Sequence, residues 1–190
     1  MIAQLISKGL LRIFGWKVMG STILKTWDKS VLVVAPHTSN WDFILALVVR
    51  KAYDFDSKFL GKASLFRPPF GGIFRWLGGY PVNRQKKSDI VQQSIQIFDQ
   101  HDRFILALSP EGTRGGNGKF RSGFYHIARG ANAQIILVTF DYGKKQVRFE
   151  NCFALTGNSE EDIPKIEKYF EGVQGKNAPS IVSSKMMCFL

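Results

Sequence analysis

Apolar residues along this chain fall into short continuous runs separated by longer amphipathic stretches. Three runs are rich in valine, isoleucine, leucine and phenylalanine: residues 31–35, 104–109 and 134–140. Runs of this length, bounded by turn residues, are typical of strands buried on both faces of a parallel sheet. Apolar residues three or four apart predict helices at residues 1–16, 41–49, 88–101 and 120–128. This alternation predicts a single α/β domain with a mostly parallel mixed sheet flanked by helices, and an N-terminal amphipathic helix.

Weaker patterns fill the intervals between these segments. They predict a short strand at 58–62, a short apolar helix within 63–79, an extended piece at 80–84, an edge strand at 144–150 and a late helix at 162–171. Asp162 or Ile163 is the expected N-cap of the late helix, because Pro164 suits a first helical turn. The segment 63–79 is rich in large apolar residues, among them Phe66, Phe70, Phe74, Trp76 and Leu77. Most of them are expected to pack in the core, with a wall of an acyl-chain pocket as the alternative use.

The predicted first helix is amphipathic and has basic surroundings. Its apolar face gathers Ile2, Leu5, Ile6, Leu10, Ile13 and Phe14. Lys8, Arg12 and Lys17 lie among or just after these residues, and no acidic residue precedes Asp28. Such a helix suits the surface of an anionic membrane, where each basic residue adds about 1 kcal/mol to binding. The alternative is an ordinary amphipathic helix packed on the domain.

The charge of the whole chain narrows the possible partners. The 190 residues suit one domain with a sizeable core, and the formal net charge is +11. Such a charge implies an anionic partner: a membrane surface, nucleic acid or a phosphorylated small molecule. Cys152 and Cys188 form no disulfide or metal framework, so we expect a reduced, intracellular protein. No apolar run reaches the roughly 18 residues of a membrane-spanning helix, and we expect no signal peptide.

The strongest chemical signal is the stretch His37-Thr-Ser-Asn-Trp-Asp42, where a predicted strand gives way to a predicted helix. Thr38 or Ser39 is available as the helix N-cap. Open α/β sheets usually bind their substrates at such junctions. A carboxylate that holds one ring nitrogen of a histidine leaves the other nitrogen free to accept a proton. His37 is therefore a candidate general base oriented by Asp42, a pairing worth about 10²–10⁴-fold in rate.

The same two residues also have a purely structural interpretation. A histidine after a strand is often a capped turn residue, and an aspartate favours the positive end of a helix. No serine or cysteine is marked by a nucleophile-elbow motif such as G-x-S-x-G. A base without a marked nucleophile suggests that the substrate supplies one, for example a hydroxyl.

Two further segments place polar residues after predicted strands. An arginine at the end of an extended piece, here Arg84, can grip a phosphate through two hydrogen bonds. The segment 110–118 is glycine-rich, so its backbone can approach a ligand closely. It offers an acid, a hydroxyl and a guanidinium in Glu111, Thr113 and Arg114. It lacks the lysine and the spacing of a nucleotide P-loop, and a flexible exposed turn is the alternative.

Taken in order, these blocks resemble the glycerolipid acyltransferases of the lysophosphatidic acid acyltransferase type. Residues 37–42 match the H-x4-D motif, residues 79–84 resemble the second motif, which ends in arginine, and residues 111–114 match E-G-T-R. Lys62-Ala-Ser-Leu and the following Pro-Phe-Gly resemble the linking segment of the family. The resemblance covers more than half of the chain.

The resemblance implies a fold and a division of the chain. We expect a glycerolipid-acyltransferase-like domain at 31–173, a membrane-surface segment at 1–30, and a tail of unknown structure at 174–190. One block departs from the family. Its fourth motif normally carries a proline at the end of a strand, where this chain reads Leu137-Val-Thr-Phe-Asp141. This departure bears on donor or acceptor preference more than on the reaction.

The resemblance also implies an activity in membrane lipid synthesis. An acyl chain would move from acyl-CoA or acyl carrier protein to a hydroxyl of a lyso-lipid, with 1-acylglycerol-3-phosphate as the expected acceptor. His37 would deprotonate that hydroxyl and Asp42 would orient His37, without an acyl-enzyme. The polar end of the acceptor would be positioned by Arg84, Glu111, Gly112, Thr113 and Arg114. No metal or other cofactor is expected, and the enzyme would be peripheral on the cytoplasmic face of a membrane.

Two other function classes stay open from the sequence. A non-catalytic basic module could bind anionic lipid or nucleic acid, but the chain has no recognised nucleic-acid motif, so we do not expect nucleic acid. Metal-dependent hydrolysis could use His37, Asp42 and Glu111, although these residues lack a metal-binding spacing.

Overall fold

The computed structural model describes residues 2–83, 87–112 and 119–177. In chain order its elements are α1 (Ile2–Ile13), β1 (Lys17–Met19), η1 (Ser21–Lys25), β2 (Lys29–Ala35), α2 (Asn40–Tyr53), β3 (Ser57–Lys62), η2 (Ala63–Phe66), α3 (Gly71–Trp76), β4 (Gly79–Val82), α4 (Lys87–Asp99), β5 (Phe104–Leu108), α5 (Gly123–Gly130), β6 (Gln134–Asp141), β7 (Gln146–Phe153) and α6 (Ser159–Tyr169). The elements η1 and η2 are short 3₁₀ helices.

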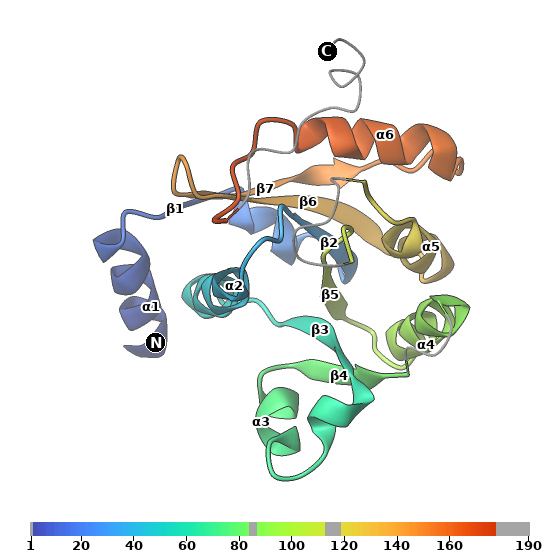
Figure 1. Cartoon of the computed structure of the whole chain (residues 1–190), viewed down its shortest axis with the longest axis horizontal. Helices are drawn as coiled ribbons and strands as arrows, with labels where there is room; N and C mark the ends of the chain where they lie inside the picture. The colour runs from blue at the N-terminus through green and yellow to red at the C-terminus, as the bar shows by residue number, and fades with distance from the viewer. Residues whose placement is uncertain (1, 84–86, 113–118, 178–190) are drawn as a thin grey trace.

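A seven-stranded sheet runs through the part of the chain that the structure describes (Figure 1). The strand order is β1-β7-β6-β2-β5-β3-β4. Every neighbouring pair is parallel except β6 and β7, which are antiparallel. One face of the sheet packs against α1 and α2, and the other against α4, α5 and α6. The predicted α/β class with a mostly parallel mixed sheet is therefore confirmed.

Strand β2 lies inside the sheet and contributes side chains to both cores. Val31 and Val33 face α4, α5 and α6, where they share a core with Tyr125. Leu32 faces the other way and packs with Val49 of α2. Because both faces are covered, β2 is apolar at consecutive positions rather than at alternate ones. Each such buried side chain stabilises the fold by about 1.5–3 kcal/mol, which fixes the strand that leads into the candidate site.

The prediction of an edge strand at 144–150 is wrong. The strand forms as β7, but β1 pairs with it in parallel, with Val18 opposite Val147, so β7 lies one position inside the sheet. Val147 and Phe149 are buried and alternate with the more exposed Arg148 and Glu150, and this alternation resembles an edge strand. Strand β1 has only three residues and gave no signal of its own.

The predicted start of the late helix is also wrong. Helix α6 begins at Ser159, and Asn158 is its N-cap, with its side-chain oxygen accepting a hydrogen bond from the Glu160 N–H at 3.0 Å. Pro164 lies inside the helix rather than in its first turn. Asp162 is not a cap but is fully buried, where its carboxylate accepts hydrogen bonds from the Tyr125 hydroxyl and from Thr156. An acid beside a proline resembles a helix start, and here it serves the core.

Helix α1 turns its main apolar face away from the domain. The six side chains that define this face are between 41% and 79% exposed: Ile2, Leu5, Ile6, Leu10, Ile13 and Phe14. Ser7 and Leu11 are buried instead, and α1 packs against α2. Lys8 extends along this contact, with its Nζ 5.6 Å from the centroid of the Tyr53 ring. The helix therefore contacts the domain through a narrow strip and leaves its apolar face exposed.

Candidate active site

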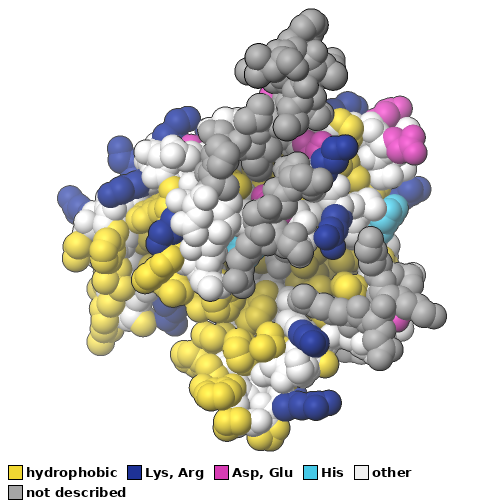
Figure 2. Space-filling view, viewed as in Figure 1, with side chains coloured by type: hydrophobic (Ala, Val, Ile, Leu, Met, Phe, Trp, Pro, Cys, Tyr) yellow, Lys and Arg dark blue, Asp and Glu magenta, His cyan; other side chains and the backbone are white. Residues whose placement is uncertain are grey.

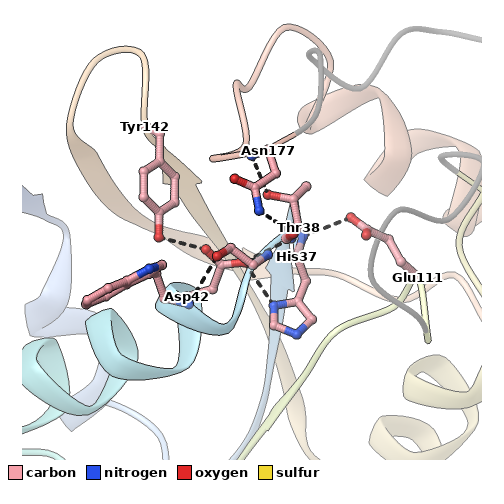
Figure 3. Close-up of polar contacts among 8 residues, drawn as sticks. His37, Thr38, Asp42, Glu111, Tyr142 and Asn177 are labelled. Atoms are coloured by element: carbon pink, nitrogen blue, oxygen red, sulfur yellow. Dashed lines mark hydrogen bonds and ion pairs between the residues drawn. The ribbon is translucent and has the colours of Figure 1, made fainter.

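The carboxyl ends of β2 and β5 bring two of the predicted motifs together. These strands are parallel neighbours, so the chain leaves both of them at the same edge of the sheet. Two residues after β2, the backbone N–H of His37 donates a hydrogen bond to Oε1 of Glu111, which follows β5, at 3.1 Å (Figure 3). The two motifs lie 74 residues apart in sequence. This contact makes the edge a single candidate site.

The start of helix α2 holds Asp42 facing back toward the preceding turn. Ser39 is the N-cap, and its hydroxyl accepts a hydrogen bond from the Trp41 N–H at 3.2 Å. Asp42 returns the contact, because its Oδ2 accepts from the Ser39 N–H at 2.9 Å, which completes a capping box. The same oxygen accepts from the Thr38 N–H at 2.9 Å and meets His37 Nδ1 at 3.0 Å. Helix capping and the contact with histidine thus share one carboxylate.

The second oxygen of this carboxylate is also occupied. The Tyr142 hydroxyl donates a hydrogen bond to Asp42 Oδ1 at 2.7 Å. Burial alone raises the pKa of Asp42, which is 2% exposed, but the hydrogen bonds from His37, Tyr142, Ser39 and Thr38 outweigh burial and lower the pKa below its ordinary value of 3.8. Burial and the bond to Asp42 raise the pKa of Tyr142, so its hydroxyl stays a donor. Asp42 is therefore an ionised acceptor at neutral pH.

The ionised Asp42 decides which nitrogen of His37 carries the hydrogen. A carboxylate can only accept, so Nδ1 of a neutral ring must be the donor, and Nε2 then has the free lone pair. The His37 side chain is 27% exposed, and within the described residues no hydrogen bond engages Nε2. The arrangement can therefore take a proton from a bound hydroxyl and stabilise the imidazolium that forms.

Glu111 and Gly112, which follow β5, lie beside the turn at residues 37–42, which we call the histidine turn. Glu111 is buried, and burial raises its pKa above the ordinary value despite the hydrogen bond from the His37 N–H. Gly112 has a φ of +72°, and a Cβ at this position would lie 2.8 Å from Nε of Arg121. Glycine suits both the left-handed backbone and the close side chain. The described contact of Glu111 is thus with the backbone of the histidine turn, and a contact with substrate stays a prediction.

Three of the predicted substrate-binding residues lie outside the described residues: Arg84, Thr113 and Arg114. Their expected role at the polar end of the acceptor stays a prediction. The described ends of their segments are Asn83 and Gly112.

Two contacts of the turn were not predicted from the sequence. Tyr142 follows β6, the neighbour of β2 in the sheet, so a polar aromatic residue at the end of that strand was a usable signal. Asn177 comes from the segment predicted as a tail: its N–H donates to Thr38 Oγ1 at 3.3 Å, and its Nδ2 donates to the Thr38 carbonyl at 3.4 Å. No local pattern marks this return of the chain, so pairing across 139 residues had to come from the structure.

The described residues contain no group of three or more His, Cys, Asp or Glu side chains arranged to hold a metal ion. They also contain no helix that is both long enough and apolar enough to cross a bilayer.

Comparison with known proteins identifies the family of this chain. A family model described as Acyltransferase matches residues 16–141, about two thirds of the chain. Among solved structures, the chain is similar in fold to the 1-acyl-sn-glycerophosphate (LPA) acyltransferase PlsC from Thermotoga maritima. The TM-score is 0.56 and the sequence identity is 20%, over 88% of this chain and 74% of that chain. No curated protein matches this sequence. Because the family model covers more than half of the chain, the protein belongs to the acyltransferase family and is an acyl-transferring enzyme.

Proposed function

We propose that this acyltransferase moves a fatty acyl chain from a thioester, acyl-CoA or acyl carrier protein, to a hydroxyl of a lyso-lipid. The expected acceptor is 1-acylglycerol-3-phosphate. The observation that carries the proposal is the pair His37 and Asp42, whose Nδ1 and Oδ2 lie 3.0 Å apart beside a ring nitrogen without a described partner. The similarity in fold to a protein named as an LPA acyltransferase supports the choice of acceptor.

In the proposed mechanism the lipid hydroxyl is the nucleophile. Nε2 of His37 accepts the hydroxyl proton while the oxygen attacks the thioester carbonyl carbon, and Asp42 stabilises the imidazolium. The tetrahedral oxyanion then collapses, the carbon–sulfur bond breaks, and the leaving thiolate takes the proton back from His37. The products are a new ester and a free thiol, and no acyl-enzyme forms. Backbone N–H groups would stabilise the oxyanion.

Binding of the acceptor is the second part of the proposal. Arg84 and Arg114 would hold its phosphate, and Thr113 and Gly112 would form the loop around it. Glu111 contacts the histidine turn in the structure, so it would couple this loop to the position of the base. Holding both substrates in register supplies much of the remaining rate enhancement.

We further propose that the enzyme is peripheral on the cytoplasmic face of a membrane. Its acceptor is a lipid, and its thioester donors are water-soluble. The net charge of +11 favours an anionic surface, and α1 offers an exposed apolar face with basic residues at its margins.

The test is a product assay over a panel of lyso-lipid acceptors, each offered with acyl-CoA and with acyl carrier protein. Thiol release should require an acceptor, and mass spectrometry should find one new ester per thiol. His37→Ala should lose essentially all thiol release. His126→Ala is the matched control, because His126 is an exposed residue of α5 and should leave the rate unchanged. Full turnover by His37→Ala with an intact fold would remove His37 from the mechanism.

A further inference from the structure

The segment after β3 exposes a cluster of large apolar side chains. Leu65 of η2 is exposed, as are Phe70, Ile73 and Trp76 around α3, with Trp76 at 82% the most exposed of them. We call these four residues the η2–α3 patch. Figure 2 shows hydrophobic side chains gathered over α3 at the bottom of the view, on the same face as those of α1 at the left. Scattered apolar residues are normal on a protein surface, but a contiguous group this large usually has a partner.

The exposure of the patch does not come from poor packing of its segment. Phe66 from the same segment is buried, and the backbone carbonyl of Phe66 accepts a hydrogen bond from Arg75 at 3.2 Å. Gly71 packs so closely on Phe66 that a Cβ on Gly71 would collide with the Phe66 carbonyl. The segment is therefore folded firmly around Phe66, and this same fold presents Phe70 and Trp76 outward. The sequence-based expectation of core packing holds for Phe66 and is wrong for Phe70 and Trp76.

The charges around the patch indicate the kind of partner. No acidic residue lies between Asp56 and Asp89, a stretch that carries seven lysines and arginines. Lys62, Arg67 and Arg75 are exposed beside the patch. Apolar side chains rimmed by cations fit an anionic lipid surface, in which the rings insert and the cations meet headgroups. A second copy of this chain would instead bring like charges together.

The segment that carries the patch starts from the same edge of the sheet as the candidate site. Strand β3 is a parallel neighbour of β5 and ends at Lys62, so η2 starts from the edge of the sheet that carries His37. Trp41 and Ile44 of α2 expose further apolar surface, four and seven residues after His37. A bilayer contacting this surface would supply a lipid acceptor close to the base.

We propose that the η2–α3 patch docks on an anionic lipid bilayer as a second contact beside α1. The proposal rests on the proposed function, since a lipid acceptor is what gives membrane docking a purpose. Docking through two separate contacts would fix the orientation of the candidate site toward the membrane, which α1 alone cannot do.

The test compares vesicle binding by the full chain and by Phe70→Ser/Trp76→Ser. Co-sedimentation uses vesicles of equal phosphatidylglycerol and phosphatidylcholine. The partition coefficient of the double variant should be lower by at least about tenfold, because two inserted rings are lost. Met19→Ser is the matched control, an exposed apolar residue on β1 at the opposite edge of the sheet. Its partition coefficient should equal that of the unchanged chain.

A second pair of variants tests the cationic rim. Lys62→Gln/Arg67→Gln should weaken binding to the anionic vesicles about tenfold or more and leave the weak binding to pure phosphatidylcholine unchanged. Lys165→Gln/Lys168→Gln on α6 removes the same charge from another face and should have a smaller effect. Equal losses from both pairs would show that only net charge matters, and would overturn the patch.

Failure of the patch can be told apart from failure of the proposed function. With a short-chain lyso-lipid that stays monomeric in water, Phe70→Ser/Trp76→Ser should keep the thiol-release rate of the unchanged chain. Vesicle binding by the unchanged chain without any acyl transfer would overturn the function and leave the patch standing. Equal vesicle binding by the double variant, or a dimer of the unchanged chain that the double variant dissociates, would overturn the patch.

A separate observation concerns the candidate site itself. We infer that Tyr142 is a positioning residue for the His37–Asp42 pair. Its hydroxyl holds Asp42 Oδ1 at 2.7 Å, its ring packs edge-on against Trp16 with centroids 4.9 Å apart, and its N–H donates to the Gln174 carbonyl at 2.8 Å. Tyr142 is thus fixed on three sides and directs one hydroxyl at the carboxylate. It lies just beyond the stretch that the family model matches.

Tyr142→Phe removes this hydroxyl and keeps the ring. With one hydrogen-bond donor fewer, the Asp42 carboxylate stabilises the imidazolium form of His37 more strongly. The acidic limb of the kcat/KM profile should therefore move to higher pH. We expect kcat to fall about tenfold with KM unchanged, because Asp42 loses the contact that holds Oδ1 and then positions His37 less well. Besides Tyr142, the titratable group that contacts this pair among the described residues is Glu111, and Lys176 lies over the neighbouring Trp41 ring.

Tyr169→Phe is the matched control, since the Tyr169 hydroxyl contacts Arg148 rather than the site. It should leave both kcat and the pH profile unchanged. A fall in kcat without movement of the acidic limb would mean that Tyr142 acts through packing alone, and would overturn its positioning role. An unchanged kcat in Tyr142→Phe would overturn it as well.

Discussion

The turn at residues 37–42 and the η2–α3 patch differ in where their side chains find partners. In the turn, both oxygens of the Asp42 carboxylate accept hydrogen bonds from within the chain, from two backbone N–H groups, an imidazole and a phenol. In the patch, Phe70 and Trp76 have most of their surface uncovered. A region whose polar groups are satisfied internally is preorganised, whereas a region with uncovered apolar surface is complementary to something outside the chain.

This difference predicts how variants should behave in two assays. Changes in the turn should lower the rate with any acceptor, whether it is monomeric in water or held in a vesicle. Changes in the patch should lower the rate only with vesicles.

The largest effect is expected from Asp42→Asn. The amide lacks the charge that stabilises the imidazolium and no longer selects the tautomer with hydrogen on Nδ1. We expect kcat/KM to fall about 10²–10⁴-fold in thiol-release assays with monomeric acceptor and with vesicles alike. A loss confined to vesicles would contradict a catalytic role for this carboxylate and would place Asp42 with the patch instead.

Glu111 should show a smaller effect that depends on the replacement. Glu111→Ala leaves the partly buried His37 N–H without its acceptor, which should destabilise the fold by about 1–3 kcal/mol and lower kcat in both assays. Glu111→Gln keeps an oxygen that can accept from this N–H, so it should retain most of the stability. Urea unfolding and thiol release would check both variants. Equal losses from Ala and Gln would indicate that the charge of Glu111, rather than its contact with the turn, is what matters.

Acid stability offers a third measurement on the turn. The pKa of Asp42 is lowered in the folded protein, so its stabilising contribution is full above the ordinary aspartate range and is lost as the pH falls. The unchanged chain should therefore lose thermal stability between about pH 5 and about pH 3, and Asp42→Asn should lose less over the same interval. Glu111 works in the opposite direction, because its pKa is raised. Identical pH dependence in both proteins would show that Asp42 is not held as described.

The smallest effect is expected from Asn177→Ala. The substitution removes the side-chain hydrogen bond from Nδ2 to the Thr38 carbonyl at 3.4 Å and keeps the backbone N–H bond to Thr38 Oγ1. Because the residue is also exposed, kcat should fall only about two- to fivefold. The effect should be equal with monomeric acceptor and with vesicles. An effect seen only with vesicles would indicate that residues 174–177 contribute to membrane binding rather than to the turn.

The sequence revealed those parts of the fold and site that depend on neighbours in the chain. Strands β2, β5 and β6 are apolar at consecutive positions because both their faces are buried, and this pattern is visible in the residues themselves. The capping geometry that joins His37 to Asp42 spans a single turn, so its spacing was equally visible.

What the sequence concealed depends on pairing across the sheet. Tyr142 reaches Asp42 only because β6 lies beside β2, and Asn177 reaches Thr38 only because the chain returns past α6. Strand β1 is too short to have a period, which is why β7 was mistaken for an edge. The outward direction of Phe70 and Trp76 depends on how their segment folds around Phe66, and composition alone does not determine it.

One carboxylate at the start of α2 both caps the helix and contacts His37, and this restricts how an inactive form of the enzyme should be made. Replacing Asp42 would silence the chemistry and loosen the first turn of α2 together, so any change in lipid capture would have two causes. His37 caps nothing with its ring. A dead enzyme built to trap its natural lipid for identification should therefore carry the change at His37 and keep Asp42.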